Sequence, residues 1–133
     1  MADTGKHRDL GLFILLLGIG VMFMGHGLPK MMGGPAKWEA LGSATGHLGI
    51  HFAPAFWGFM AAFAELGGGV LLATGVLFRP ACLLMFTTML VAAVQHISNG
   101  DSFVVLSHAI EAAILFFSMF LIGPGPWRLR IAR

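Results

Sequence analysis

The sequence predicts an all-α integral membrane protein, a four-transmembrane-helix bundle, from three observations. Charged residues make up 11% of the 133 residues, whereas a soluble domain carries about 25%. Hydrophobic residues make up 57%, and the mean hydropathy is +0.85. The apolar stretches are continuous rather than alternating, which disfavours a β-barrel. Since a spanning helix needs about 20 apolar residues, the length accommodates four of them with short loops.

Each of the four apolar segments is bounded by helix-breaking residues. Pro29 ends the first segment, Arg79-Pro80 separates the second from the third, and Asn99-Gly100-Asp101 forms a turn before the fourth. These boundaries predict a single transmembrane domain, 1–133, with helices over residues 10–28, 54–78, 80–98 and 102–122. The connection over 29–53 is the sizeable outer loop, and it is predicted to contain a short interfacial helix with Trp38 at headgroup level.

The distribution of cations predicts that both termini are cytoplasmic. With both ends on one side, that side carries six cations and the opposite side two, as the positive-inside rule requires. The six are Lys6, Arg8, Arg79, Arg128, Arg130 and Arg133, and the two are Lys30 and Lys37. We therefore expect a multi-pass protein of the cytoplasmic (inner) membrane, with the loop at 29–53 outside. The small net charge of +2 gives no nucleic-acid surface.

Ionisable groups inside the predicted helices need an explanation, because charge in hydrocarbon is costly. Glu65 lies roughly 16 Å along the second helix and Glu111 roughly 13 Å along the fourth, at the 1.5 Å rise of an α-helix. Both are therefore predicted near the membrane midplane. His108 lies one turn from Glu111 on the same face. We interpret these three residues as candidate catalytic groups that carry protons.

A second group of polar residues is predicted near the outer ends of the helices. It comprises His26 and Lys30 on the first helix and Gln95 and His96 on the third. Together with the midplane residues they predict a polar pocket that opens outward, in which these four bind a quinone headgroup as cofactor. The structural alternative is that the intramembrane Glu bonds across the bundle and fixes helix register.

Other site chemistries have less support in the residue pattern. One His108-x-x-Glu111 pair is too little for a di-metal site in a helix bundle, and no histidine spacing singles out a haem ligand pair. We therefore assign no metal site. The regular glycine spacings predict small stripes for close helix packing; one is Gly11, Gly18 and Gly25, and the other is Gly20 and Gly27.

Several runs together resemble the DoxX family of small four-helix membrane proteins, over about residues 8–125. His26–Gly42 is similar to the family's first loop, and Phe56–Ala81 to its second helix, including Ala64-Glu65 and the Gly75-x-x-x-Arg79-Pro80 exit. The helix-4 Glu111 also fits, as do His96 with Asn99-Gly100-Asp101 and Gly123-Pro124-Gly125. The sequence departs from the family pattern at Pro126-Trp127-Arg128.

The resemblance implies a four-helix bundle in the cytoplasmic membrane and a link to redox physiology. Some relatives are regarded as a subunit of a thiosulfate:quinone oxidoreductase, and others as membrane partners of oxidative-stress enzymes. We therefore expect the membrane subunit of a quinone-linked oxidoreductase. Its electrons would come from other membrane or redox subunits, because no haem, flavin or iron–sulfur motif occurs. The alternative is a non-catalytic structural or assembly subunit of a larger membrane complex, and a homo-oligomer is compatible with both.

Overall fold

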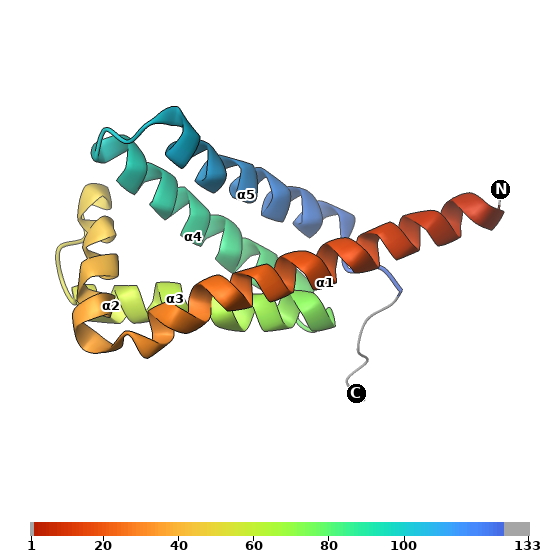
Figure 1. Ribbon diagram of the computed structural model, residues 1–133, viewed down its shortest axis with the longest axis horizontal. Helices are drawn as coiled ribbons and strands as arrows, with labels where there is room; N and C mark the ends of the chain where they lie inside the picture. Colours follow the sequence, from red (N-terminus) through yellow and green to blue (C-terminus); the bar gives the residue numbers. More distant parts are fainter. Residues whose placement is uncertain (1, 127–133) are drawn as a thin grey trace.

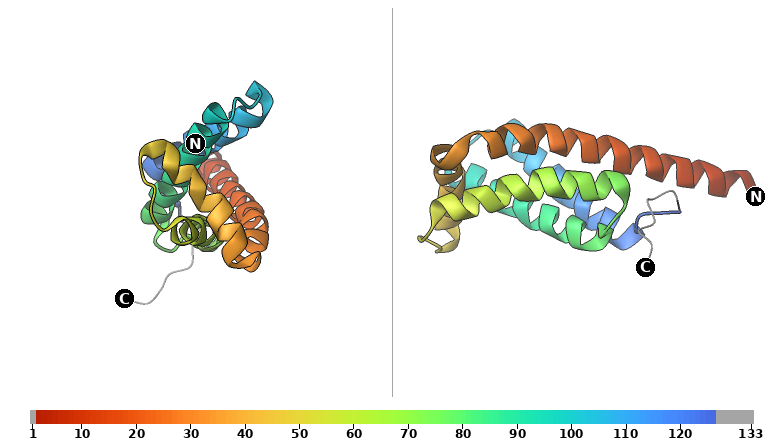
Figure 2. Two further views of the ribbon diagram at one scale, coloured as in Figure 1. Left: turned by 90° about the vertical axis from the view of Figure 1, so that its left-hand side faces the viewer. Right: turned by 90° about the horizontal axis from the view of Figure 1, so that it is seen from below.

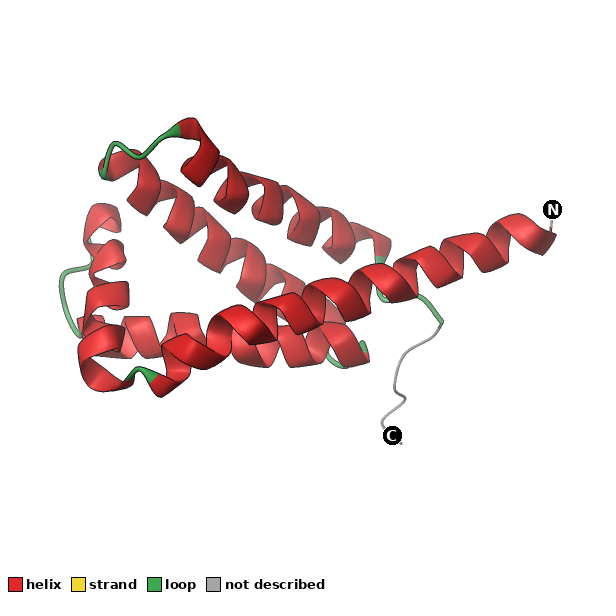
Figure 3. Ribbon diagram, viewed as in Figure 1, coloured by secondary structure: helices red, strands yellow, loops and turns green. Residues whose placement is uncertain are grey.

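The computed structural model describes residues 2–126, and this part of the chain is helical with no strand. The elements follow the order α1 (Ala2–Met32), α2 (Gly34–Gly42), a 3-10 helix η1 (Ser43–Leu48), α3 (Pro54–Thr74), α4 (Phe78–Ser98) and α5 (Phe103–Ile122) (Figures 1 and 3). The predicted all-helical class is confirmed. The basic tail counted in the orientation argument lies in residues 127–133, outside the described residues.

Four of these helices are long and apolar enough to span a membrane. They are α3, α4, α5 and Thr4–Met32 of α1. At 1.5 Å per residue the 21 residues of α3 extend about 31 Å, which matches a hydrocarbon core of about 30 Å. The prediction of a four-span membrane protein is therefore confirmed. α1 is longer, and its first turns extend beyond the rest of the bundle (Figure 1).

The first helix runs past both of its predicted ends. It includes the polar residues before Leu10, which contain no proline, and it continues through Pro29 to Met32. The chain leaves the helix at the following glycines. The Gly33 N–H donates to the Lys30 carbonyl at 3.3 Å, and Gly34 adopts a φ of +79°, a conformation that glycine tolerates without a Cβ penalty.

The break between the second and third spans lies at residues 75–77 rather than at Arg79-Pro80. Gly75 has a φ of +75° and its N–H bonds the carbonyls of Leu71 and Leu72, which ends α3 at Thr74. α4 then begins at Phe78 and includes Pro80. A proline is tolerated there because the N–H groups of a first turn have no intrahelical acceptor.

The helices pack as two pairs, which are joined by the α3–α4 contact, by η1 against α4 and by the edge-on ring contact of Phe23 of α1 with Phe116 of α5. α1 lies along α3 and α4 lies along α5, while α3 also contacts α4 and is crossed by α2 (Figures 1 and 2). α2 and η1 lie at the end of the bundle that also holds the α4–α5 turn, which we name the loop end. The opposite end, with the α3–α4 turn, we name the core end.

The buried apolar core lies toward the core end. Its largest fully buried side chains are Phe116, Leu72, Met85, Met119 and Cys82. Leu16 of α1 and Phe78 at the start of α4 belong to the same cluster. The other half of the bundle holds the buried carboxylate described below, so apolar and polar contacts are separated along the bundle axis.

One of the two glycine stripes forms the contact between α1 and α3. A Cβ on Gly20 would lie 2.6 Å from the Gly69 carbonyl oxygen, and one on Gly27 would collide with the Leu66 backbone nitrogen. This stripe is confirmed as a packing surface. Gly18 and Gly25, together with Gly11, have nothing within 4 Å of such a Cβ, so the second predicted stripe faces away from the other described helices.

Candidate functional site

Lys30 and Glu65 form an ion pair between α1 and α3. The Lys30 Nζ donates to both carboxylate oxygens of Glu65, each at 2.9 Å. The Glu65 side chain is 6% exposed and that of Lys30 is 33% exposed. Among the described residues, Glu65 is the one charged residue that is buried. A nearly buried carboxylate is thus held by a lysine that reaches the surface of the bundle.

The backbone brings the end of α1 to the middle of α3. Gly27, one turn before Lys30, packs against the backbone of Glu65 and Leu66. The first turns of α3 extend past α1 and are covered by α2, where Gly58 contacts the Trp38 carbonyl. Lys30 was predicted near a helix end and Glu65 near the midplane, and this crossing lets the two meet.

Trp38 of α2 completes the site from a third element. Its Nε1–H donates to the Lys30 carbonyl at 3.1 Å, so this helix-terminal carbonyl accepts a second hydrogen bond besides that from the Gly33 N–H. The indole ring packs edge-on to Phe59 of α3, with centroids 5.1 Å apart. From the sequence, Trp38 is predicted as a membrane anchor only. No local pattern signals that it reaches back eight residues across the Gly33-Gly34 turn.

Glu111 and His108 lie elsewhere. Both side chains are exposed on α5. Among the described residues, no Cα of α5 comes within 8 Å of a Cα of α3. The structure therefore does not bring these two candidates to Glu65, although all three lie within membrane-spanning helices. Equal depth in the membrane does not fix the direction in which a side chain points.

The remaining candidates have separate environments. His96 Nδ1 lies 2.7 Å from Asp101 Oδ2, a polar contact across the α4–α5 turn with both side chains about one third exposed. The Gln95 Oε1 is buried and has no hydrogen-bond partner among residues 2–126. His26 is exposed on α1, and its ring meets Phe23 edge-on at 5.8 Å. Of the residues predicted to line an outward polar pocket, the structure therefore brings together Lys30 and Glu65, and Trp38 joins them.

One N–H of the Lys30 ammonium is not used within the ion pair. A lysine ammonium carries three N–H donors and no acceptor, and Glu65 takes two of them. No third acceptor contacts the Lys30 Nζ within the described part of the chain. Because Lys30 is one third exposed, the third N–H can reach an acceptor outside the chain, and the arrangement can bind a carbonyl oxygen next to a carboxylate.

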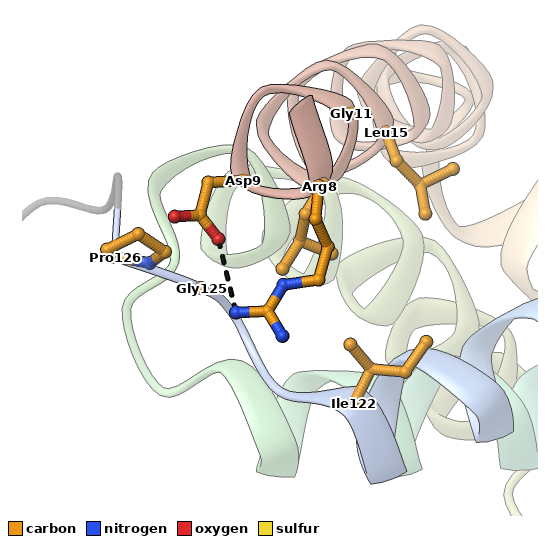
Figure 4. Close-up of a pocket in the computed structure, with 8 residues that line it drawn as sticks. Arg8, Asp9, Gly11, Leu15, Ile122, Gly125 and Pro126 are labelled. Atoms are coloured by element: carbon orange, nitrogen blue, oxygen red, sulfur yellow. Dashed lines mark ion pairs between the residues drawn. The ribbon is translucent and has the colours of Figure 1, made fainter. Parts of the chain in front are cut away.

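Two surface hollows are lined by other residues. One, of about 330 Å³, lies between the start of α1 and the segment after α5, beside the Arg8–Asp9 ion pair at 3.5 Å (Figure 4). The other, of about 300 Å³, is an apolar groove between α4 and α5. Within residues 2–126, no group of three or more His, Cys, Asp or Glu side chains is placed to hold a metal ion.

The model of the DoxX family matches residues 11–97, which include Lys30, Trp38 and Glu65 and stop before α5. No curated protein matches, and no solved structure matches.

Proposed function

The chain belongs to the DoxX family, and we propose that it is the membrane subunit of a quinone-linked oxidoreductase. The observation that carries this proposal is the buried Glu65 carboxylate held by the partly exposed Lys30 at 2.9 Å. Intramembrane ionisable groups are conserved for function often enough to be treated as candidate sites. We place this protein in the cytoplasmic membrane with the Lys30–Glu65 pair toward the outer surface.

The pair fits a ligand with a carbonyl oxygen. The third N–H of Lys30 would donate to that oxygen, and Glu65 keeps the ammonium in place through its two hydrogen bonds. A bound quinone would supply the two-electron chemistry, with the electrons coming from another subunit. Lys30 would pass one proton to the carbonyl oxygen that it binds and regain one from water through Glu65, and the second proton that a two-electron reduction needs would reach the other carbonyl oxygen from water. Trp38 fixes the Lys30 backbone through its indole donor.

The test compares quinone content and quinone reduction in the wild type and three variants. The wild type, purified in mild detergent, is expected to retain quinone, and Glu65→Gln and Lys30→Met are expected to lose it. Arg8→Gln is the matched control, because Arg8 is a cation at the other end of α1. Absence of quinone from the wild type, with unchanged quinone reduction in Glu65→Gln membranes, would refute the proposal.

A non-catalytic structural or assembly subunit is the second candidate. The same ion pair supports it, because Lys30 and Glu65 join α1 to α3 and α2 is tied to both. Under this alternative, Glu65→Gln would lower the amount of assembled complex without changing the turnover of each assembled complex. The quinone-linked role predicts the reverse, namely normal assembly with reduced turnover.

A further inference from the structure

The hollow of about 330 Å³ at the core end has a lining of two kinds (Figure 4). Apolar side chains line it from two elements, with Leu12 and Leu15 on α1 and Ile122 at the end of α5. The charged part of the lining is the neighbouring pair Arg8 and Asp9. The hollow therefore combines an apolar wall with one cation and one carboxylate.

Two glycines shape this hollow. Gly125 has a φ of +74°, and a Cβ on it would lie 2.7 Å from Leu12 Cδ2, so glycine lets the segment after α5 pass close to α1. Gly11 is the opposite case, because a Cβ there would meet no heavy atom within 4 Å outside its own stretch of helix. Space therefore stays open beside Gly11, where a ligand can lie.

The hollow lies at the ends of two membrane-spanning helices. Arg8 and Asp9 directly precede the apolar stretch of α1, which starts at Leu10. Ile122 is the last residue of α5, which is also long and apolar enough to span a membrane. Charged residues that flank a span lie at the level of the lipid headgroups. The apolar wall of the hollow then lies beside the glycerol and the first acyl carbons of the lipid.

The two charged groups leave capacity for a ligand. Arg8 Nη2 lies 3.5 Å from Asp9 Oδ1, longer than the roughly 2.7–2.9 Å of a close charge-assisted hydrogen bond. The Arg8 side chain is 82% exposed and that of Asp9 is 25% exposed. A guanidinium has several N–H donors, so Arg8 can stay beside Asp9 and still donate to an acceptor outside the chain.

We propose that this hollow binds a phospholipid with a phosphoethanolamine headgroup. Arg8 donates to the phosphate, Asp9 accepts from the ammonium, and the glycerol and first acyl carbons cover Leu12 and Ile122. The argument for this occupant is charge complementarity, since its phosphate and ammonium are joined by two carbons and Arg8 and Asp9 are adjacent. An anionic headgroup meets the Asp9 carboxylate beside Arg8, and a choline headgroup has no N–H to donate to Asp9.

The test is native mass spectrometry of the full-length protein, titrated with phospholipids of identical acyl chains. Phosphatidylethanolamine is expected to bind roughly tenfold more tightly than phosphatidylglycerol or phosphatidylcholine, the effect of one hydrogen bond to a charged group. Gly11→Leu fills the hollow and should remove this preference. Gly18→Leu is the matched control, because Gly18 is seven residues further along α1 and is equally open, and it should keep the preference.

Two further variants test the charged groups. Arg8→Gln should weaken the binding of phosphatidylethanolamine roughly tenfold, through loss of the donor to its phosphate. Asp9→Asn should remove the preference over phosphatidylglycerol, because the neutral amide neither attracts the ammonium nor repels an anionic headgroup. Equal or tighter binding of phosphatidylglycerol or phosphatidylcholine by the wild type would overturn the proposal. So would a preference that persists in Gly11→Leu or in Asp9→Asn.

This lipid site does not depend on the quinone-linked role. Lys30→Met should keep the preference for phosphatidylethanolamine while it loses quinone, and Arg8→Gln should keep quinone while it loses the lipid. If Gly11→Leu does not accumulate, Arg8→Gln and Asp9→Asn decide by themselves.

Discussion

Lys30 at the end of α1 holds both carboxylate oxygens of Glu65 in the middle of α3, with each N–O distance 2.9 Å. The two residues differ in exposure, 33% for the Lys30 side chain and 6% for Glu65. This difference decides what happens when one of them is removed. Without Lys30 a charge stays buried, whereas without Glu65 the lysine can turn toward the surface.

Lys30→Met should therefore destabilise the protein more than Glu65→Gln. Removal of one member of a buried ion pair costs about 3–5 kcal/mol, and we expect Lys30→Met to approach that range. Glu65→Gln should cost about half as much, since the freed ammonium can be solvated. Unfolding by denaturant in detergent micelles measures both, and Lys30→Met/Glu65→Leu should recover part of the loss. An equal cost for the two single variants would show that their environments do not differ.

The two glycine stripes should respond differently to added bulk. Gly20→Val places side-chain atoms where the Gly69 carbonyl lies, and an overpacked contact costs about 1–3 kcal/mol. Gly18→Val lies on the open face and should leave the free energy of unfolding nearly unchanged. Thermal unfolding of the two purified variants gives the comparison, and a larger loss for Gly18→Val would mean that α1 packs through its other face.

The two tryptophans of the loop end provide a matched pair. Trp38→Phe removes one of the two donors to the Lys30 carbonyl, leaves the Gly33 N–H as the other, and keeps the ring contact with Phe59, at a cost of about 1 kcal/mol. Trp57→Phe removes an Nε1–H that is buried without a partner among the described residues, so it should be neutral or slightly stabilising. Chemical denaturation of both variants checks the order, and the reverse order would contradict the assigned hydrogen bond.

Arg79 holds the end of α5 from the start of α4. Its Nε donates to the Phe120 carbonyl at 3.3 Å, near the helix C-terminus where a cation is favourable. Because Arg79 is exposed, Arg79→Gln should cost no more than about 1 kcal/mol. Hydrogen exchange should show faster opening of the last turn of α5 and an unchanged α1. Faster exchange throughout the bundle would instead indicate a global role for Arg79.

The four membrane-spanning helices can be predicted from the sequence, because a continuous apolar stretch is a local property of the chain. The sequence also identifies Lys30 and Glu65 as costly groups, and the Gly20–Gly27 spacing as a packing surface. The ends of α1 and α3 differ from the prediction, which places the breaks at prolines. The chain instead turns at Gly34 and Gly75, which adopt left-handed conformations.

Which residues form the site depends on the rotation of each helix about its own axis. The depth of a residue in the membrane does not give that rotation. Glu65 and Glu111 were grouped because both lie near the midplane, yet α3 turns Glu65 toward α1 while α5 turns Glu111 outward. That difference is set by which faces pack: the backbone of α5 approaches α4 alone among the described elements, and Phe116 on its inner face meets Phe23 of α1, which leaves the face with Glu111 exposed. The contribution of Trp38 depended on the path of α2 across α3, which no local pattern specifies.

The central claim is that the Lys30–Glu65 pair binds a quinone headgroup, and photolabelling tests it most directly. A quinone analogue with a photoreactive group on its ring is irradiated with the protein in membranes, and the labelled peptides are mapped by mass spectrometry. The account predicts label on the segments that contain Lys30, Trp38 and Glu65, competed by unlabelled quinone and lost in Lys30→Met. Labelling that is confined to other segments, or that persists unchanged in Lys30→Met, would contradict it.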